Sequence, residues 1–271
     1  MNWSTISRPS TSAAGWWMSV VPLVLMMLML IAPHAQAQAD DAGKILKAMS
    51  DYVANQRTIS IAFDSDIEVI TPDLQKLQFT SSGKLLLSRP DKIRASRTGG
   101  YADVELVFDG KRLTIYGKHI NGFAQTDSPG STDQLIDRLR NEYGVEAPGA
   151  DLLLSHAYDE LIADVYDAKH IGQGVIDGVE CEHLAFRNED TDWQLWVEAG
   201  DRSIPRKYVI TSKSVTGGPQ YTLRIKDWKT DVQASPDEFA FKEPAGAKKI
   251  EFKELSDIDE VPAGVVKGGK Q

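Results

Sequence analysis

Residues 175–210 read VIDGVECEHLAFRNEDTDWQLWVEAGDRSIPRKYVI, which is three short apolar-rich segments separated by turn residues. The pair Asp177-Gly178 is typical of a tight hairpin turn, because glycine readily adopts the positive φ that such a turn requires. Residues 193–198 alternate between apolar and mixed side chains, as expected for a strand with one apolar face. The stretch therefore predicts an antiparallel β-meander.

The same two-residue period appears on both sides of this stretch. Residues 58–69 alternate most cleanly, and shorter strands are expected at residues 92–97, 104–108, 113–116, 119–126 and 221–232. Residues 74–87 are interrupted at Gly83, which predicts either one long strand with a bulge or a hairpin. Asp109-Gly110 is a second hairpin signal.

Helical spacing of apolar residues appears before the strands and again between them. Residues 40–53 carry one apolar face, and Ser131 is expected to cap a helix that contains Leu135 and Leu139. Residues 150–154 and 158–166 are further short helical segments. The order helix, strands, helices, strands predicts one domain of the α+β class, mainly β, with a large antiparallel sheet covered on one face by helices.

The N-terminus is typical of an export signal. An apolar run from Met18 to Ala32 follows Arg8, and the small-x-small pattern Ala37-Gln38-Ala39 comes after it. The run is too short for a comfortable membrane span, so we expect a signal peptide of residues 1–39, cleaved near Ala39, and no permanent membrane anchor. The expected product is periplasmic, with a folded domain at residues 40–252 and a poorly ordered tail at 253–271.

The net charge makes some classes of binding partner unfavourable, and the cysteine count excludes an intrachain disulfide. The chain carries a net charge of −9, and removal of Arg8 with the leader makes it −10. An acidic chain is a poor partner for nucleic acid, and also for anionic membrane surfaces. The single cysteine, Cys181, cannot form an intrachain disulfide, and its place within a strand predicts a buried small residue.

Signatures of enzymes are missing from the sequence. It contains no nucleophile elbow, zinc-protease helix, Walker loop or dinucleotide fingerprint, so we expect no catalysis, no cofactor and no metal. Ser155 and His156 are adjacent, whereas catalytic triads are built from separate segments. The acidic stripe of Asp64, Asp66 and Glu68 is interpreted as the solvated face of a strand.

The segments DGVECEHLAF, DWQLWVE, IPRKY and SPDEFAF resemble a family of predicted periplasmic proteins of unknown function. That family is similar to the lipoprotein-carrier superfamily, which includes LolA, LolB and the RseB sensor domain. The resemblance covers residues 40–252. It implies an incomplete antiparallel β-barrel of about ten or eleven strands, with helices covering its open side over an apolar cavity. Relatives use the cavity for acyl chains, or the surface to sense the state of the envelope.

The apolar faces of the expected strands provide the candidate site. They form either a packed core or, if the curved sheet is wider than its side chains can fill, the wall of a ligand cavity. The first function that we consider is a non-catalytic carrier or binding protein for a lipid-like or acylated ligand. The alternative is an envelope sensing or protein-interaction module, with an envelope protein as partner and a vestigial cavity. The residues expected to line the cavity are Ile61, Phe63, Ile67, Phe79, Leu87, Leu106, Phe108, Trp193 and Leu195.

Overall fold

A computed structural model describes residues 32–143, 145, 147–252, 261–262 and 265 of the chain. Residues 1–31 of the expected 1–39 signal peptide, and nearly all of the expected tail at 253–271, lie outside the described residues. The strands are β1 (Thr58–Ile70), β2 (Lys76–Ser88), β3 (Lys92–Gly99), β4 (Asp103–Phe108), β5 (Arg112–Gly117), β6 (Gly122–Asp127), β7 (Asp167–Ile176), β8 (Val179–Arg187), β9 (Thr191–Glu198), β10 (Pro205–Ser212), β11 (Gln220–Thr230) and β12 (Lys248–Lys249). The helices are α2 (Ala32–Ala54), α3 (Thr132–Asn141), α4 (Ala157–Ile162), and the 3₁₀ turns η1 (Ala150–Leu153) and η2 (Pro236–Phe239).

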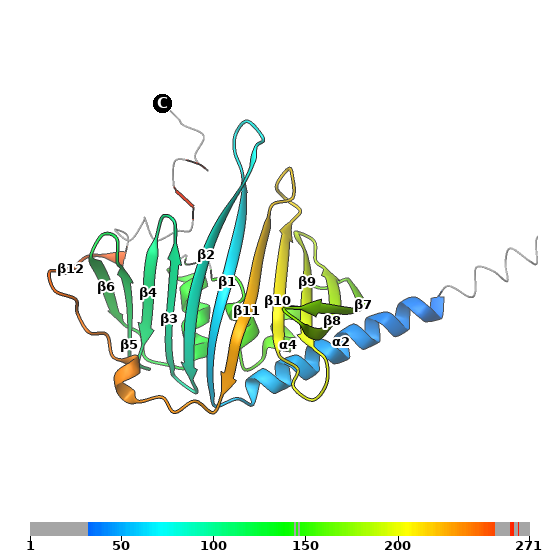
Figure 1. Ribbon diagram of the computed structural model, residues 1–271, viewed down its shortest axis with the longest axis horizontal. Coiled ribbons are helices and arrows are strands. Elements are labelled where there is room, and N and C mark those ends of the chain that lie inside the picture. Colours follow the sequence, from blue (N-terminus) through cyan, green and yellow to red (C-terminus); the bar gives the residue numbers. More distant parts are fainter. Residues whose placement is uncertain (1–31, 144, 146, 253–260, 263–264, 266–271) are drawn as a thin grey trace, which may run out of the picture.

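All strands belong to one open sheet in the order β12-β6-β5-β4-β3-β2-β1-β11-β10-β9-β8-β7 (Figure 1). Every neighbouring pair is antiparallel except β12 and β6, which run parallel over two residues. The two outer strands, β12 and β7, do not pair with each other, so the curled sheet does not close. The predicted incomplete antiparallel barrel is confirmed; the part of the chain that the structure describes contains eleven strands of six residues or more and the two-residue β12.

The two predicted hairpin turns are confirmed. Asp177 and Gly178 have φ of 50° and 83°, and Gly110 has φ of 90°. The carboxylate of Asp109 accepts hydrogen bonds from the backbone N–H groups of Lys111 and Arg112, which fixes the second turn. Both turns are local in origin, because the glycine supplies a conformation that other residues adopt only at a cost.

Gly83 lies within one continuous strand, β2, whose registers with β1 and β3 show no shift. Neither a bulge nor a hairpin is present there. The reason for the glycine is steric: a Cβ atom at this position would lie 2.1 Å from Cζ of Phe63 on β1. The ring of Phe63 therefore occupies the space above the glycine. The glycine does not mark a break in the strand; it marks a position where a side chain of the neighbouring strand comes close to the backbone.

Several predicted boundaries shift. The strand expected at 119–126 begins only at Gly122, because Asn121, with φ of 46°, ends a turn before it. Strand β7 starts at Asp167, before the stretch at 175–210 from which the meander was predicted. The capping box of α3 is confirmed, since Oγ of Ser131 accepts from the Gln134 N–H and the Gln134 side chain accepts from the Ser131 N–H.

Helix α2 begins at Ala32, upstream of the expected cleavage point, and runs through it. The inward face of α2 is fully buried at Ala42, Leu46, Met49 and Val53. This spacing of three to four residues places the four side chains on one stripe. None of the described helices is long and apolar enough to cross a membrane.

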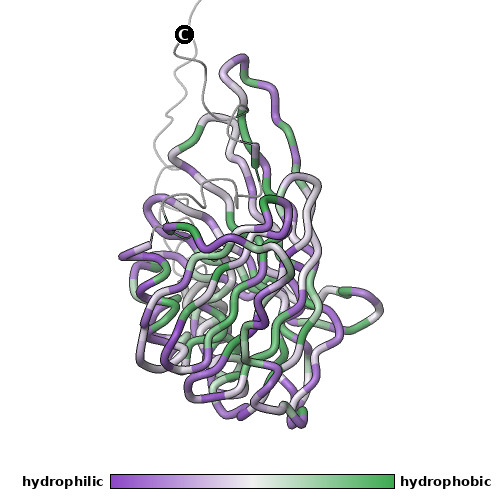
Figure 2. The backbone as a smooth tube through the Cα atoms, turned by 90° about the vertical axis from the view of Figure 1, so that its left-hand side faces the viewer, coloured by the Kyte–Doolittle hydropathy of each residue, from purple (hydrophilic) through white to green (hydrophobic). Residues whose placement is uncertain are grey.

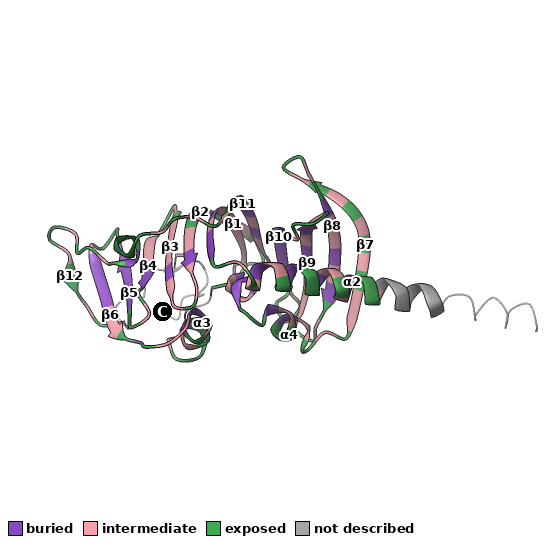
Figure 3. Cartoon of the chain, turned by 90° about the horizontal axis from the view of Figure 1, so that it is seen from below, coloured by how far each residue is buried: buried purple, intermediate pink, exposed green. Residues whose placement is uncertain are grey.

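The two faces of the sheet differ in character. Figure 3 shows α2, α3 and α4 on one side of the curled sheet, which we call the inner face. In Figure 2, hydrophobic and hydrophilic residues alternate along the strands. The outer face carries the acidic stripe of β1, in which Asp64 pairs with Lys226, Asp66 accepts from Thr80, and Glu68 lies 2.9 Å from Nζ of Lys76. The predicted polar face is confirmed, and Cys181 is a free, fully buried thiol as expected.

Candidate functional site

All nine residues of the predicted site lie on the inner face. The registers align Ile61 with Leu85 and Ile67 with Phe79, so the odd-numbered residues of β1 and β2 share one side. The same alignment continues to β4 through β3 and to β9 through β11 and β10. Side chains two residues apart along a strand point the same way, and residues in register across strands do too.

The nine residues divide into two groups by burial. Ile61, Leu87, Phe108, Trp193 and Leu195 are between 0% and 7% exposed and belong to the packed core beneath the helices. Phe63, Ile67, Phe79 and Leu106 are only partly buried. Phe63 and Leu106 border the core, whereas Ile67 and Phe79 lie outside the core cluster, toward the β1–β2 turn. That these nine residues line a ligand site stays a prediction.

The partly buried group marks a second apolar surface on the inner face. The β1–β2 and β10–β11 hairpins extend well past the level of α4 in Figure 1. The ring of Tyr101, which is 57% exposed, meets Phe79 edge-on with centroids 5.3 Å apart. We call this surface the open strip; its partly buried members are Phe63, Ile67, Val69, Leu77, Phe79, Val104, Leu106 and Tyr221.

Polar residues occupy two adjacent rows of the otherwise apolar inner face. Ser65 and Ser81 are aligned on β1 and β2, are 0% and 4% exposed, and have hydroxyl oxygens 2.7 Å apart. In the adjoining row, Arg97 on β3 is aligned with Gly83 on one side and with Val104 on the other. The inner face therefore carries a hydrogen-bonding pair and a cation next to apolar side chains.

Two surface hollows are formed by other described residues. One, of about 440 Å³, is lined by polar and acidic side chains at the start of β9 and includes Tyr166 and Asp190. The other, of about 490 Å³, lies at the edge formed by β12 and includes Lys249 and Phe252. Neither hollow contains any of the nine predicted residues.

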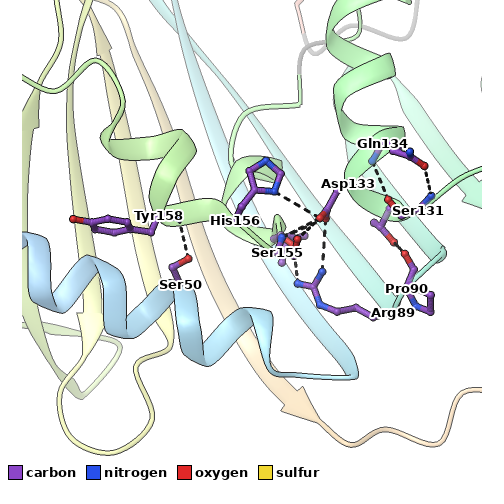
Figure 4. Close-up of polar contacts among 11 residues, drawn as sticks. Ser50, Arg89, Pro90, Ser131, Asp133, Gln134, Ser155, His156 and Tyr158 are labelled. Carbon is purple, nitrogen blue, oxygen red and sulfur yellow. Dashed lines mark hydrogen bonds and ion pairs between the residues drawn. The ribbon is translucent and has the colours of Figure 1, made fainter.

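A partly buried polar cluster joins the helices to the sheet at the β2–β3 turn (Figure 4). Asp133, in the first turn of α3, accepts from both the N–H and the hydroxyl of Ser155, and its carboxylate lies 3.8 Å from the guanidinium of Arg89. Arg89 also donates to the carbonyl of Leu153 at 2.7 Å. Burial lowers the pKa of Arg89, and the charge of Asp133 opposes that shift.

This cluster is not arranged as a catalytic triad. The Ser155 hydroxyl binds the carboxylate of Asp133 directly, and Nδ1 of His156 lies 3.8 Å from the same carboxylate. A triad instead places the base between the serine and the acid. The sequence pattern singled out Ser155-His156 and missed Asp133; its only local signal was an acidic residue in the first turn of a capped helix.

A second polar contact holds η1 against the sheet. Asp151 of η1 lies beside Tyr208 of β10, and Tyr208 is 3% exposed. Burial raises the pKa of Asp151 and also raises that of Tyr208 well above its usual value, with the neighbouring Asp151 adding to the second shift. Nothing in the sequence pattern indicated this pair, because its members are more than fifty residues apart.

The other histidines of the sheet have separate partners. Nε2 of His170 lies 2.7 Å from the carboxylate of Glu182, whereas His183 contacts Gln194 at 2.9 Å and stacks on Trp196. Among the described residues, no three His, Cys, Asp or Glu side chains are grouped in a way that could hold a metal ion.

The open curled sheet, with helices on its inner face, defines this molecule as an incomplete β-barrel protein. The sequence matches, over residues 42–253, the family described as "Predicted periplasmic protein (DUF2092)". The chain belongs to this family, and the resemblance noted in its strand and turn segments is thereby confirmed. No curated protein matches it in sequence.

Several solved structures are distantly similar. An uncharacterized conserved protein from Thermus thermophilus is 10% identical, with a TM-score of 0.46 over 78% of this chain and 99% of the other. LprF from Mycobacterium bovis is 12% identical, with a TM-score of 0.43 over 73% and 98%. A chain of the Pseudomonas aeruginosa MucA/MucB complex is 12% identical, with a TM-score of 0.41 over 74% of this chain and 61% of that one.

Proposed function

We propose that this protein is an exported, non-catalytic binding protein or carrier for a lipid-like or acylated ligand, which it holds against the open strip. The observation that carries the proposal is the division of one apolar sheet face into a packed part and a partly exposed part. Phe63, Ile67 and Phe79 lie in the second part. Contiguous apolar surface of this kind commonly marks a ligand or interaction site.

The energetics of such a site are favourable for an acyl chain. Burial of each methylene group gains about 0.8 kcal/mol, so a chain of about ten carbons supplies roughly 8 kcal/mol before the costs of association. A net binding free energy of about −8 kcal/mol corresponds to a micromolar dissociation constant, so this gain sets the upper limit of the affinity that a ten-carbon chain alone supplies. The partly buried side chains of the open strip would lose their remaining contact with water on binding, which adds to the gain.

A carboxylate placed in the middle of the open strip is expected to weaken acyl binding by about tenfold or more. Phe79→Glu introduces a charge where the ligand chain would lie, and desolvating that charge opposes binding. We expect the affinity of the delipidated protein for a fluorescent fatty acid to fall by about tenfold or more, as followed by fluorescence titration.

Gln78→Glu is the matched control, because Gln78 is the preceding residue of β2 and is exposed on the outer face. This variant introduces the same charge on the other side of the same strand and should bind as the unaltered protein does. If the unaltered protein binds no fatty acid or phospholipid, the carrier proposal fails. A module that binds an envelope protein would then be the better account.

Export with cleavage near Ala39 is part of the same proposal. The family description supports a periplasmic location. The buried stripe of α2 starts at Ala42, so a cut at residue 39 would leave those core contacts intact. N-terminal sequencing of protein recovered from the periplasm should give a first residue close to Asp40. Recovery from the membrane fraction with the N-terminus near Met1 would refute the cleavage.

A further inference from the structure

The two outer strands of the sheet differ in how they are covered. Along β6 the chain's own C-terminal part adds the short strand β12, which pairs with Gly122 and Phe123. At the other end of the strand order is β7, and in the described part of the chain no further strand pairs with it (Figure 3). An uncovered edge strand presents backbone N–H and C=O groups that can pair with an extended segment of another chain. The β7 edge is therefore a candidate interaction surface.

The pairing of β7 with β8 shows which backbone groups are available. Residues 172–176 are in regular register with β8, and the two-residue turn makes Ile176 and Val179 a hydrogen-bonded pair. Hydrogen-bonded pairs occur at every second residue of an antiparallel ladder. The N–H and C=O groups of Gln173 and Val175 therefore point away from β8. Among the described residues, neither of these two takes part in a backbone hydrogen bond outside the strand ladders, so these groups are available to a partner.

Exposed apolar side chains are concentrated at the same edge. Seven large hydrophobic residues are exposed among the described residues, and three of them belong to β7 or directly precede it: Tyr166, Ile171 and Val175, with exposed fractions of 64%, 54% and 65%. Gly172 and Gly174 alternate with the last two and carry no side chain. Exposed apolar groups that lie close together are typical of interaction sites. A strand added along β7 would cover part of Ile171 and of Val175.

An acidic hollow lies beside the residues that precede β7. It has a volume of about 440 Å³. Its exposed carboxylates are those of Asp164, Glu189 and Asp190. The two basic residues beside it, Arg187 and Lys213, both pair with Asp192 instead. Negative charge that is not paired with a basic side chain favours a partner with basic residues at this point. It also disfavours a second copy of this acidic chain, which would bring the same hollow.

We propose that the β7 edge binds an extended segment of another protein as an additional antiparallel strand with a basic C-terminal end. The backbone of the segment pairs with Gln173 and Val175, alternate apolar side chains lie beside Val175 and Ile171, and the basic end reaches the hollow at Asp190. In such complexes main-chain hydrogen bonds supply affinity and the side-chain pattern supplies specificity. Strands β8 to β11 separate this edge from β1 and β2, so the inference is independent of acyl binding to the open strip.

The first test uses a synthetic peptide with this pattern and the unaltered full-length protein. The probe is a fluorescein-labelled nine-residue peptide of alternating valine and threonine that ends with two lysines. A valine directly opposite Val175 points its own N–H at the edge, so N-methylation of the valines should weaken binding at least about tenfold in fluorescence anisotropy titrations. N-methylation of the threonines alters the opposite side of the peptide and should change the affinity by no more than about threefold.

Val175→Lys should weaken binding of the unmethylated peptide about tenfold, because it removes an apolar contact and adds a like charge at the edge. Val215→Lys is the matched control, since Val215 is a 44% exposed valine of the β10–β11 turn and the variant has the same net charge. It should bind as the unaltered protein does. Asp190→Asn should weaken binding about threefold and reduce its dependence on salt, whereas Asp201→Asn, in the exposed β9–β10 turn, should change neither.

Several results would overturn the β7 proposal. One is the absence of binding by the unmethylated peptide. Another is an equal effect of the two N-methylations, or of Val175→Lys and Val215→Lys, because β7 would then not pair with the peptide. A dimer of the unaltered protein in sedimentation experiments that Val175→Lys makes monomeric also overturns it, because the edge would then pair with a second copy. None of these results affects the proposed acyl binding, and failure of Phe79→Glu to weaken fatty-acid binding would leave the β7 edge unaffected.

Discussion

Phe108→Ala is expected to lower the free energy of unfolding by about 3–5 kcal/mol, because it empties the centre of the packed half of the inner face. Phe108 is fully buried and is aligned with Ile93 on one side and Leu113 on the other. Removal of the ring forfeits its transfer from water and leaves a cavity that the strand pairing keeps from collapsing. Urea denaturation followed by tryptophan fluorescence measures the loss.

Phe79→Ala is the variant with which Phe108→Ala is compared. Phe79 lies on the same face but is only partly buried and outside the core cluster. Its removal should cost clearly less stability than that of Phe108, on the order of 1 kcal/mol, and should weaken acyl binding instead. Equal losses of stability for the two variants would show that the inner face is one continuous core. The open strip would then not be a ligand site.

Asp133→Ala is expected to lower the free energy of unfolding by about 1–3 kcal/mol, because it leaves a partly buried arginine without its carboxylate. Asp133 and Arg89 are 20% and 15% exposed at their side chains, so water replaces the lost contact poorly. Ser155 loses its hydrogen-bond acceptor at the same time. The connection of α3 and α4 to the β2–β3 turn should therefore loosen.

Asp137→Ala is the matched control, since Asp137 is an exposed acidic residue of the same helix. It should change stability by no more than about 0.5 kcal/mol. Asp133→Asn should fall between the two, because the amide keeps an acceptor for Ser155 while the charge opposite Arg89 disappears. If the Asp133→Ala protein is as stable as the Asp137→Ala protein, the cluster does not anchor α3 and α4 to the sheet.

The sequence by itself determined the local structure of this protein. The turn at Asp177-Gly178 and the capping box at Ser131 depend on backbone conformations and hydrogen bonds within a few residues, so their chemistry is visible in the chain. Alternation in residues 58–69 likewise identified the inward side of β1. The family resemblance supplied the curled, incomplete barrel into which these elements assemble.

Gly83 shows where local interpretation failed. The glycine led us to expect an interrupted strand. In the structure the strand is continuous, and the glycine leaves room for the ring of Phe63 on the neighbouring strand. A contact between two strands does not change the alternation of apolar and polar residues in either strand, so the sequence of one strand does not reveal it. For the same reason, the pairing of β1 with β11, and the joining of Asp133 to Arg89 and Ser155, could not be inferred.

Only the tertiary structure divided the apolar face into a core and an open strip. Phe108 and Phe79 both alternate in phase with their strands, and nothing in either segment tells which one the helices cover. Alternation records which side of the sheet a residue occupies, whereas burial depends on what packs against that side. The helices that cover Phe108, and the longer hairpin that carries Phe79 away from the core, come from distant parts of the chain, and only their packing in three dimensions separates the two residues.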